Sequence, residues 1–173
     1  AAQDLATDEA VYLQVVRGKT AALFSAATEV GGVIAGAEDT IVRDLFEYGD
    51  ALGIAFQIVD DLLDYQGQSA TTGKNVGDDF RERKLTLPVI KAVACADAEE
   101  RAFWSRTIER GHQEDGDLDH ALSLLKRHSA LEETRQDAIN WAGKAKAAMA
   151  RAPSHTLRDI LIDLADYVVE RIN

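Results

Sequence analysis

The chain has 173 residues and a formal net charge of −11, from 19 Lys and Arg against 30 Asp and Glu. This balance argues against a nucleic-acid partner, because a surface that follows a phosphate backbone needs an excess of positive charge. Hydrophobic residues make up 46% of the chain and there is one cysteine, so we expect a folded protein without an internal disulfide. The sequence has no apolar run of membrane-spanning length and no basic leader, which predicts a cytoplasmic protein without a transmembrane segment.

Helical periodicity dominates the sequence, and the fold class that we predict is all-α. The two prolines, Pro88 and Pro153, and the many Ala and Leu residues favour helices. Apolar residues at intervals of three and four predict a helix over 9–36, with a kink at Gly18. A second helix is predicted over 40–65, with Asp39 or Thr40 as its N-cap.

Segment 67–88 is rich in Gly, Ser, Thr and charged residues, so we expect a loop there. The remaining helices that we predict cover 87–96, 99–110, one or two stretches within 118–148, and 157–172 behind a cap at Ser154 or Thr156. The sequence has no internal repeat and no linker. We therefore expect one helical unit over residues 1–173, without an internal domain boundary.

The stretch IAFQIVDDLLDY carries the most informative pattern. On a helix, Gln57, Asp60, Asp61 and Asp64 occupy positions i, i+3, i+4 and i+7, and the positions between them are apolar. A helix that is packed on most sides places these carboxylates inside, where their charges must be neutralised by protein cations or by a metal ion. Oxygen ligands without His or Cys favour Mg²⁺, which implies a phosphorylated ligand. The alternative is that the aspartates face solvent at the end of a long helix.

Several lysines fit a phosphate site. Lys19 and Thr20 open a run of small apolar residues, where an ammonium group can bind an anion while its stem packs. Lys74 and Lys84 follow the aspartates in the chain and would offset their charge. Each of these lysines has the alternative of being an ordinary solvated side chain.

Asp78 and Asp79 leave two interpretations open. They would either bind a metal ion through water or hold their segment in place by pairing with Arg81 or Arg83. We favour the pairing.

Three segments together resemble the C-terminal half of the trans-isoprenyl diphosphate synthases: KTAALFSAATEVGGVIAG, GIAFQIVDDLLDYQG and GKNVGDDFRERKLTLPVI. The aspartates of DDLLD resemble the second aspartate-rich motif of that family. The TLP after Lys84 and the Tyr65-Gln66-Gly67 exit are similar to the bacterial long-chain members, the octaprenyl to decaprenyl synthases that make quinone side chains.

The resemblance implies a bundle of long antiparallel helices, of which residues 1–173 would be the C-terminal part of one prenyl synthase domain. It implies a Mg²⁺-dependent prenyltransferase that condenses an allylic diphosphate with isopentenyl diphosphate. It also implies a homodimer, without a nucleic-acid partner and without a transmembrane segment. The roles that it implies are catalysis by Lys19, Thr20 and Gln57, substrate binding by Lys19, Lys74 and Lys84, and metal binding by Asp60, Asp61 and Asp64.

The sequence also departs from the family. Nothing here corresponds to the N-terminal half with its first aspartate-rich motif, so we expect a fragment that is inactive alone. Arg83 stands where relatives often have glycine, which would alter how Lys84 is presented. Two other functions remain open: a noncatalytic helical subunit or interaction module of a heteromeric prenyl synthase, which loss of the aspartates would favour, and a terpene cyclase, which the Lys-Thr and Phe-Gln elements disfavour.

Overall fold

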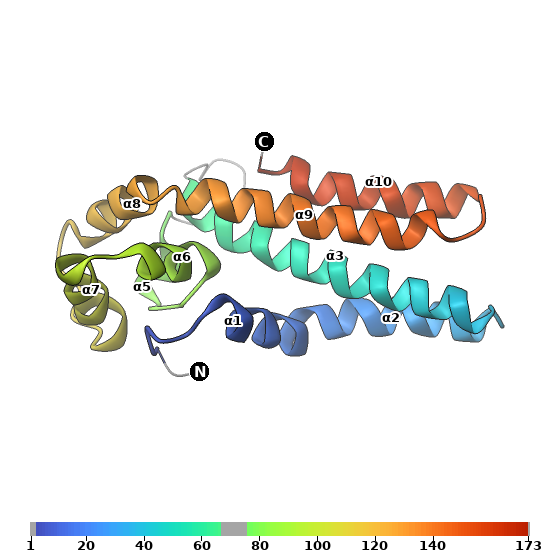
Figure 1. Cartoon of the computed structure of the whole chain (residues 1–173), viewed down its shortest axis with the longest axis horizontal. Helices are drawn as coiled ribbons and strands as arrows, with labels where there is room; N and C mark the ends of the chain where they lie inside the picture. The colour runs from blue at the N-terminus through green and yellow to red at the C-terminus, as the bar shows by residue number, and fades with distance from the viewer. Residues whose placement is uncertain (1–2, 67–75, 173) are drawn as a thin grey trace. The chain divides into compact units, whose positions relative to one another are not determined.

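The computed structural model describes residues 3–66 and 76–172, and these residues form helices and no β-strand (Figure 1). The predicted all-α class is confirmed. The chain divides into two compact units, Ala1–Tyr12 with Asp60–Arg135 (unit 1) and Leu13–Val59 with Gln136–Asn173 (unit 2). That residues 1–173 belong to one domain without an internal boundary stays a prediction. Within the described residues, no helix combines the length and the apolar character that crossing a membrane requires.

The predicted helix over 9–36 forms as three consecutive helical segments. They are α1 (Glu9–Val16), the π-helical turn η1 (Arg17–Ala21) and α2 (Ala22–Ile34). Gly18 lies in η1, so the departure from α-helical geometry falls where we expected a kink. The second predicted helix forms as α3 (Asp39–Gln66). Its first turn already includes Asp39, and the amides of Ile41 and Val42 donate to the carbonyl of Glu38.

In unit 2, α2 and α3 lie side by side because two glycines of α3 leave room for the backbone of the preceding helical segments. A Cβ atom on Gly49 would lie 2.6 Å from the carbonyl oxygen of Phe24, and one on Gly53 would lie 2.6 Å from the Cα atom of Ala21. Real Cβ atoms do not approach other atoms this closely, so these glycines set the distance between the helices.

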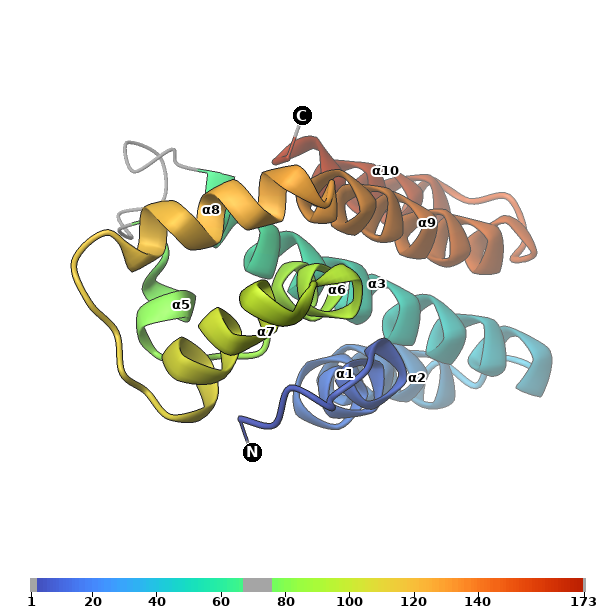
Figure 2. The same ribbon diagram turned by 60° about the vertical axis from the view of Figure 1, so that its left-hand side comes forward.

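The last two helices, α9 (Ala130–Ala150) and α10 (Thr156–Glu170), run beside each other (Figures 1 and 2). The part of α9 from Gln136 onward belongs to unit 2 together with α10. The hydroxyl of Tyr48, on α3, donates to the carbonyl of Leu161 at 2.8 Å and joins α3 to α10. The predicted cap of the last helix is wrong. The N-cap is His155, whose ring Nδ1 accepts from the amide of Leu157 at 3.1 Å, instead of Ser154 or Thr156.

Unit 1 has an aromatic core. It contains α5 (Asp78–Arg81), α6 (Leu87–Cys95), α7 (Ala98–Trp104), the π-helical turn η2 (Ser105–Glu109) and α8 (Asp117–Arg127), and α6 packs against α7 and α8 (Figure 2). The rings of Phe80, Phe103 and Trp104 pack together with centroids 5.1 to 6.5 Å apart. The expectation of a loop over 67–88 is wrong at 78–81, where the short helix α5 forms and Phe80 is buried, whereas 76–77 and 82–86 are not helical.

A buried carboxylate ties α7 to the end of α8. Glu100, at 5% exposure, accepts from the backbone amide of Asp97 at 3.1 Å and from Arg127 Nη1 at 2.7 Å, and it contacts His128 Nε2 at 2.8 Å. Burial opposes ionisation of this carboxyl, but the hydrogen bonds with His128, Arg127 and Asp97 outweigh it and hold its pKa below the ordinary value of 4.5.

The packing of Gly49 predicts opposite effects for two Gly→Ala changes. Gly49→Ala forces the helices apart and should lower the free energy of unfolding by about 1 to 3 kcal/mol. Gly143→Ala, on α9, has nothing within 4 Å of the new methyl group. It should raise stability by about 0.5 to 1 kcal/mol through helix propensity. Urea unfolding of both variants checks this, and equal effects would contradict the close approach.

The Glu100 contacts predict a loss of stability in acid. Because the folded-state pKa is lowered, their stabilisation is present above pH 4.5 and is lost as the pH falls through the folded-state value. Glu100→Gln should therefore unfold more easily at neutral pH and show a flatter stability profile between about pH 5 and pH 3. Glu99→Gln, at an exposed neighbouring position, should keep the parent profile. Thermal unfolding across this pH range distinguishes the two.

Candidate active site

The aspartates of α3 lie in unit 1, near the C-terminal end of the helix and after an apolar stretch. Asp61 is 4% exposed and Asp64 is 8% exposed, while Asp60 is half-buried. The preceding residues Ile58 and Val59 have no exposed surface. The expectation that carboxylates turn inward is therefore confirmed for Asp61 and Asp64, and the solvent-facing alternative does not hold for them.

Asp61 is held by a tyrosine from α1. The hydroxyl of Tyr12 donates to Asp61 Oδ2 at 2.7 Å, and Tyr12 itself is 7% exposed. Burial, and then the negative charge of Asp61, raise the pKa of Tyr12 well above its ordinary value of 10.0. The hydroxyl therefore keeps its proton at physiological pH and remains a donor.

Asp64 is held by backbone amides at the start of α5. The amide of Asp79 donates to Asp64 Oδ2 at 3.1 Å, and the amide of Gly77 donates to the Asp64 carbonyl at 2.9 Å. Gly77 has a φ of +78°, and a Cβ atom there would lie 2.3 Å from a methyl carbon of Leu118. Glycine is required at this turn, which delivers the Asp79 amide to the carboxylate.

Lys84 is connected to the aspartate cluster, which consists of Asp60, Asp61 and Asp64, through Asp79. Its ammonium group lies 2.8 Å from Asp79 Oδ1 and 2.7 Å from Glu82 Oε2, and these hydrogen bonds, that with Asp79 first, raise the pKa of Lys84 above its ordinary value. Asp78 pairs with Arg81 at 3.0 Å, as we favoured. The partner of Asp79, however, is Lys84 instead of an arginine.

Three further predicted residues lie on unit 2. The hydroxyl of Thr20 donates to Gln57 Oε1 at 2.9 Å, so these two side chains meet. Lys19 is exposed, and its ammonium group has no ion pair with any residue that the structure describes. Lys19 and Thr20 both lie in η1, and π-helical turns within α-helices are frequent at functional sites. Lys74 lies outside the described residues.

The donor set fits Mg²⁺ better than a metal held by protein alone. Among the described residues, no three acidic, histidine or cysteine groups converge closely enough to enclose a metal ion. Mg²⁺ usually takes one or two carboxylates and completes its coordination with water and substrate phosphate. Asp60 and Asp64, one helical turn apart, suit that mode, whereas one oxygen of Asp61 is committed to Tyr12.

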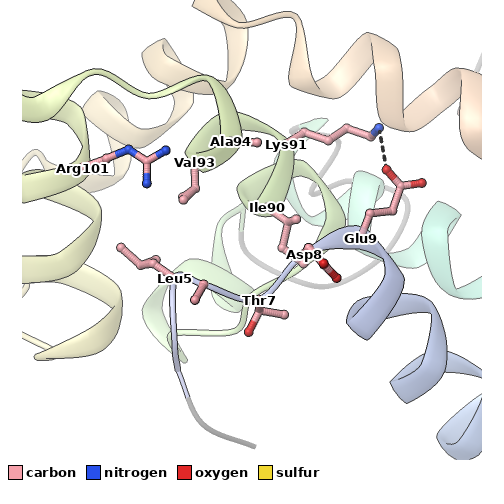
Figure 3. Close-up of a pocket in the computed structure, with 10 residues that line it drawn as sticks. Leu5, Thr7, Asp8, Glu9, Ile90, Lys91, Val93, Ala94 and Arg101 are labelled. Carbon is pink, nitrogen blue, oxygen red and sulfur yellow. Dashed lines mark hydrogen bonds and ion pairs between the residues drawn. The ribbon is translucent and has the colours of Figure 1, made fainter.

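A separate hollow of about 260 Å³ lies elsewhere in unit 1 (Figure 3). Lys91 borders it, with its ammonium group 3.4 Å from Glu9 and 3.9 Å from Glu133. The ammonium group of Lys91 therefore already has acidic partners, and Asp60, Asp61 and Asp64 do not contribute to the lining of the hollow. Its wall is formed by Leu5, Ala6, Thr7, Asp8, Glu9, Ile90, Lys91, Val93, Ala94 and Arg101.

Sequence reasoning missed Tyr12 and the Asp79 amide. A tyrosine on a helix that packs inward needs a partner for its hydroxyl, which was a usable signal for Tyr12. No signal marked the Asp79 amide, because every residue but proline carries one.

The polyprenyl synthetase family model matches residues 1–125. The chain belongs to the polyprenyl synthetase family, and the resemblance seen in its sequence is confirmed. Octaprenyl diphosphate synthase of Haemophilus influenzae is 37% identical over 168 residues, which are 97% of this chain and 51% of that protein.

Solved structures share the fold. A decaprenyl diphosphate synthase from Rhodobacter capsulatus has a TM-score of 0.94 and 68% identity, and the match covers 100% of this chain and 53% of that one. A polyprenyl synthase from Caulobacter crescentus, complexed with calcium and isoprenyl diphosphate, has a TM-score of 0.90 and 45% identity, with 97% of this chain and 51% of that one covered. The chain thus spans about half the length of these relatives.

Arg83, beside Lys84, has a φ of +57°. This left-handed conformation costs a non-glycine residue about 1 to 2 kcal/mol, which accounts for the glycine that we expect in relatives. We therefore expect Arg83→Gly to be more stable than Arg83→Ala by about 1 kcal/mol. At Arg81, inside α5, the order should reverse and alanine should be the more stable. Chemical unfolding of the four variants measures both differences.

Proposed function

We propose that the chain forms part of a Mg²⁺-dependent polyprenyl diphosphate synthase, a transferase of isoprenoid biosynthesis with a long-chain product for quinone side chains. The observation that carries this proposal is the pair of inward carboxylates on α3, each held by a donor from another part of unit 1. The names of the octaprenyl and decaprenyl relatives support the product class, and the calcium and isoprenyl diphosphate of the Caulobacter relative support the ligand class.

In this proposal, an allylic diphosphate loses its diphosphate, and the carbon that is left joins isopentenyl diphosphate. The carbon–oxygen bond to diphosphate would break first and leave an allylic cation. The double bond of isopentenyl diphosphate would then form the new carbon–carbon bond to this cation, and the departed diphosphate would take the proton that the resulting adduct loses. Mg²⁺, held by Asp60 and Asp64, would neutralise the charge that develops on diphosphate. Asp61 would support the cluster.

The lysines would bind the diphosphate groups. Lys19 is exposed and has no ion pair with a described residue, so its three donors are available to phosphate oxygens. Lys84 would exchange its contacts with Asp79 and Glu82 for contacts with substrate. We assign the same role to Lys74.

Thr20 and Gln57 would stabilise the allylic cation. The Thr20 hydroxyl donates its hydrogen bond to Gln57 Oε1. The lone pairs of the Thr20 oxygen therefore remain available to face positive charge. Dipoles that are fixed before the reaction stabilise developing charge without reorganisation. The hydrogen bond between Thr20 and Gln57 would fix both side chains in this way.

The assembled enzyme would act as a homodimer in the cytoplasm, without a nucleic-acid partner. A noncatalytic subunit of a heteromeric synthase would not need the aspartates, and their retention favours the catalytic assignment.

Binding of Mg²⁺ with inorganic diphosphate tests the proposal. A ligand that binds only the folded state raises the melting temperature, and a chelator should reverse the rise. Asp60→Asn should weaken this Mg²⁺ effect at least tenfold, because it removes a ligand and a charge. Asp163→Asn, at an exposed position on α10, removes the same charge and should leave the effect unchanged. If the parent chain shows no Mg²⁺-dependent shift, the interaction module becomes the better assignment.

A further inference from the structure

Two buried tyrosines border the aspartate cluster, and their hydroxyls have different partners. The Tyr12 hydroxyl donates to Asp61 Oδ2 at 2.7 Å, whereas the Tyr65 hydroxyl lies 3.4 Å from the hydroxyl of Thr86. Tyr12 and Tyr65 are 7% and 4% exposed. Of these two, Tyr12 therefore donates a hydrogen bond directly to one of the α3 aspartates, which lies 49 residues away in the chain.

The surroundings of Tyr12 are acidic. Asp61, Asp79 and Glu9 all act on its hydroxyl with negative charge. Asp61 is itself 4% exposed and lies next to Asp60 on the helix and one turn from Asp64. A carboxylate in this position needs a donor, because repulsion from its neighbours and the loss of water both oppose its charge. The Tyr12 hydroxyl supplies one at short distance.

The three aspartates therefore have different environments. Asp61 is fixed by a side-chain hydroxyl, Asp64 by the Asp79 amide, and Asp60 is the most exposed of the three. Groups that hold metal ligands or their neighbours in orientation typically change metal affinity by about 10- to 100-fold when they are removed. The buried bond between Tyr12 and Asp61 has the geometry of such a support.

We propose that Tyr12 is a positioning residue for the aspartate cluster: its hydroxyl fixes Asp61, so that Asp60 and Asp64 are presented to the divalent cation. This inference rests on the proposed function, since it assigns to Tyr12 a part in the same Mg²⁺ site. Tyr12 does not touch the substrate in this assignment. Its effect passes through Asp61.

Tyr12→Phe tests the inference, because it removes the hydroxyl and keeps the ring. Tyr48→Phe is the matched control, since that buried hydroxyl donates to the Leu161 carbonyl on unit 2. Both variants lose a buried hydrogen bond and should melt at lower temperature than the parent chain. Calorimetric titration with Mg²⁺ in the presence of inorganic diphosphate should give about 10- to 100-fold weaker Mg²⁺ binding for Tyr12→Phe and parent-like binding for Tyr48→Phe.

A double-mutant cycle identifies the route of the effect. In an Asp61→Ala background, Tyr12→Phe should change Mg²⁺ affinity by less than about twofold, because the group through which Tyr12 acts is gone. A full-sized effect in that background would overturn the inference, as would parent-like binding by Tyr12→Phe or equal weakening by Tyr48→Phe.

The outcomes separate this inference from the proposed function. If the parent chain binds Mg²⁺ and Asp60→Asn does not, while Tyr12→Phe binds normally, the Mg²⁺ site stands and the positioning role is overturned. If the parent chain does not bind Mg²⁺ with diphosphate, both are overturned.

Discussion

Asp61 and Asp64 lie almost out of contact with water on a helix whose neighbouring side chains are apolar. Isolated carboxylates are costly in such a place, so the fold must bring donors to them. Unit 1 does so with two kinds of donor, the Tyr12 hydroxyl and the Asp79 amide. The segments α1 and α5 thus each supply one of the donors that satisfy the charges on α3.

The contact between Thr20 and Gln57 in unit 2 depends on close helix packing. Gly49 and Gly53 let α3 approach the segment that carries Thr20, and the Thr20 hydroxyl reaches Gln57. The π-helical turn η1 alters the register of side chains at Lys19 and Thr20 without ending the helix. Small residues at one set of positions thus allow polar residues at another to meet.

Much of the fold was predictable from sequence because long helices bury periodic stripes. The bounds of α3 and α6 agree with the apolar pattern to within one residue. The helix α5 was not predicted because its sequence is polar. It forms where Phe80 is buried and where the amides of Gly77 and Asp79 donate hydrogen bonds to Asp64. A pattern that is local in sequence carries no information on such contacts.

The candidate site, like the fold, has features that the sequence predicted and features that it did not. The inward position of Asp61 and Asp64 followed from the spacing of polar residues on one helix. Their partners did not, because the bond from Tyr12 depends on how two helices are rotated against each other, which periodicity leaves open. Similarly, the His155 cap replaced Ser154 or Thr156 because a ring nitrogen accepts an amide as a hydroxyl does.

Under the proposed function, charge balance around α3 would couple the binding of the divalent cation to the binding of diphosphate. The ammonium group of Lys84 forms ion pairs with Asp79 and Glu82 instead of with Asp60. A diphosphate that took Lys84 from these acids would add negative charge to an acidic region, and a divalent cation at the carboxylates would offset that charge. Binding of the two ligands should therefore be cooperative, each lowering the electrostatic cost of the other.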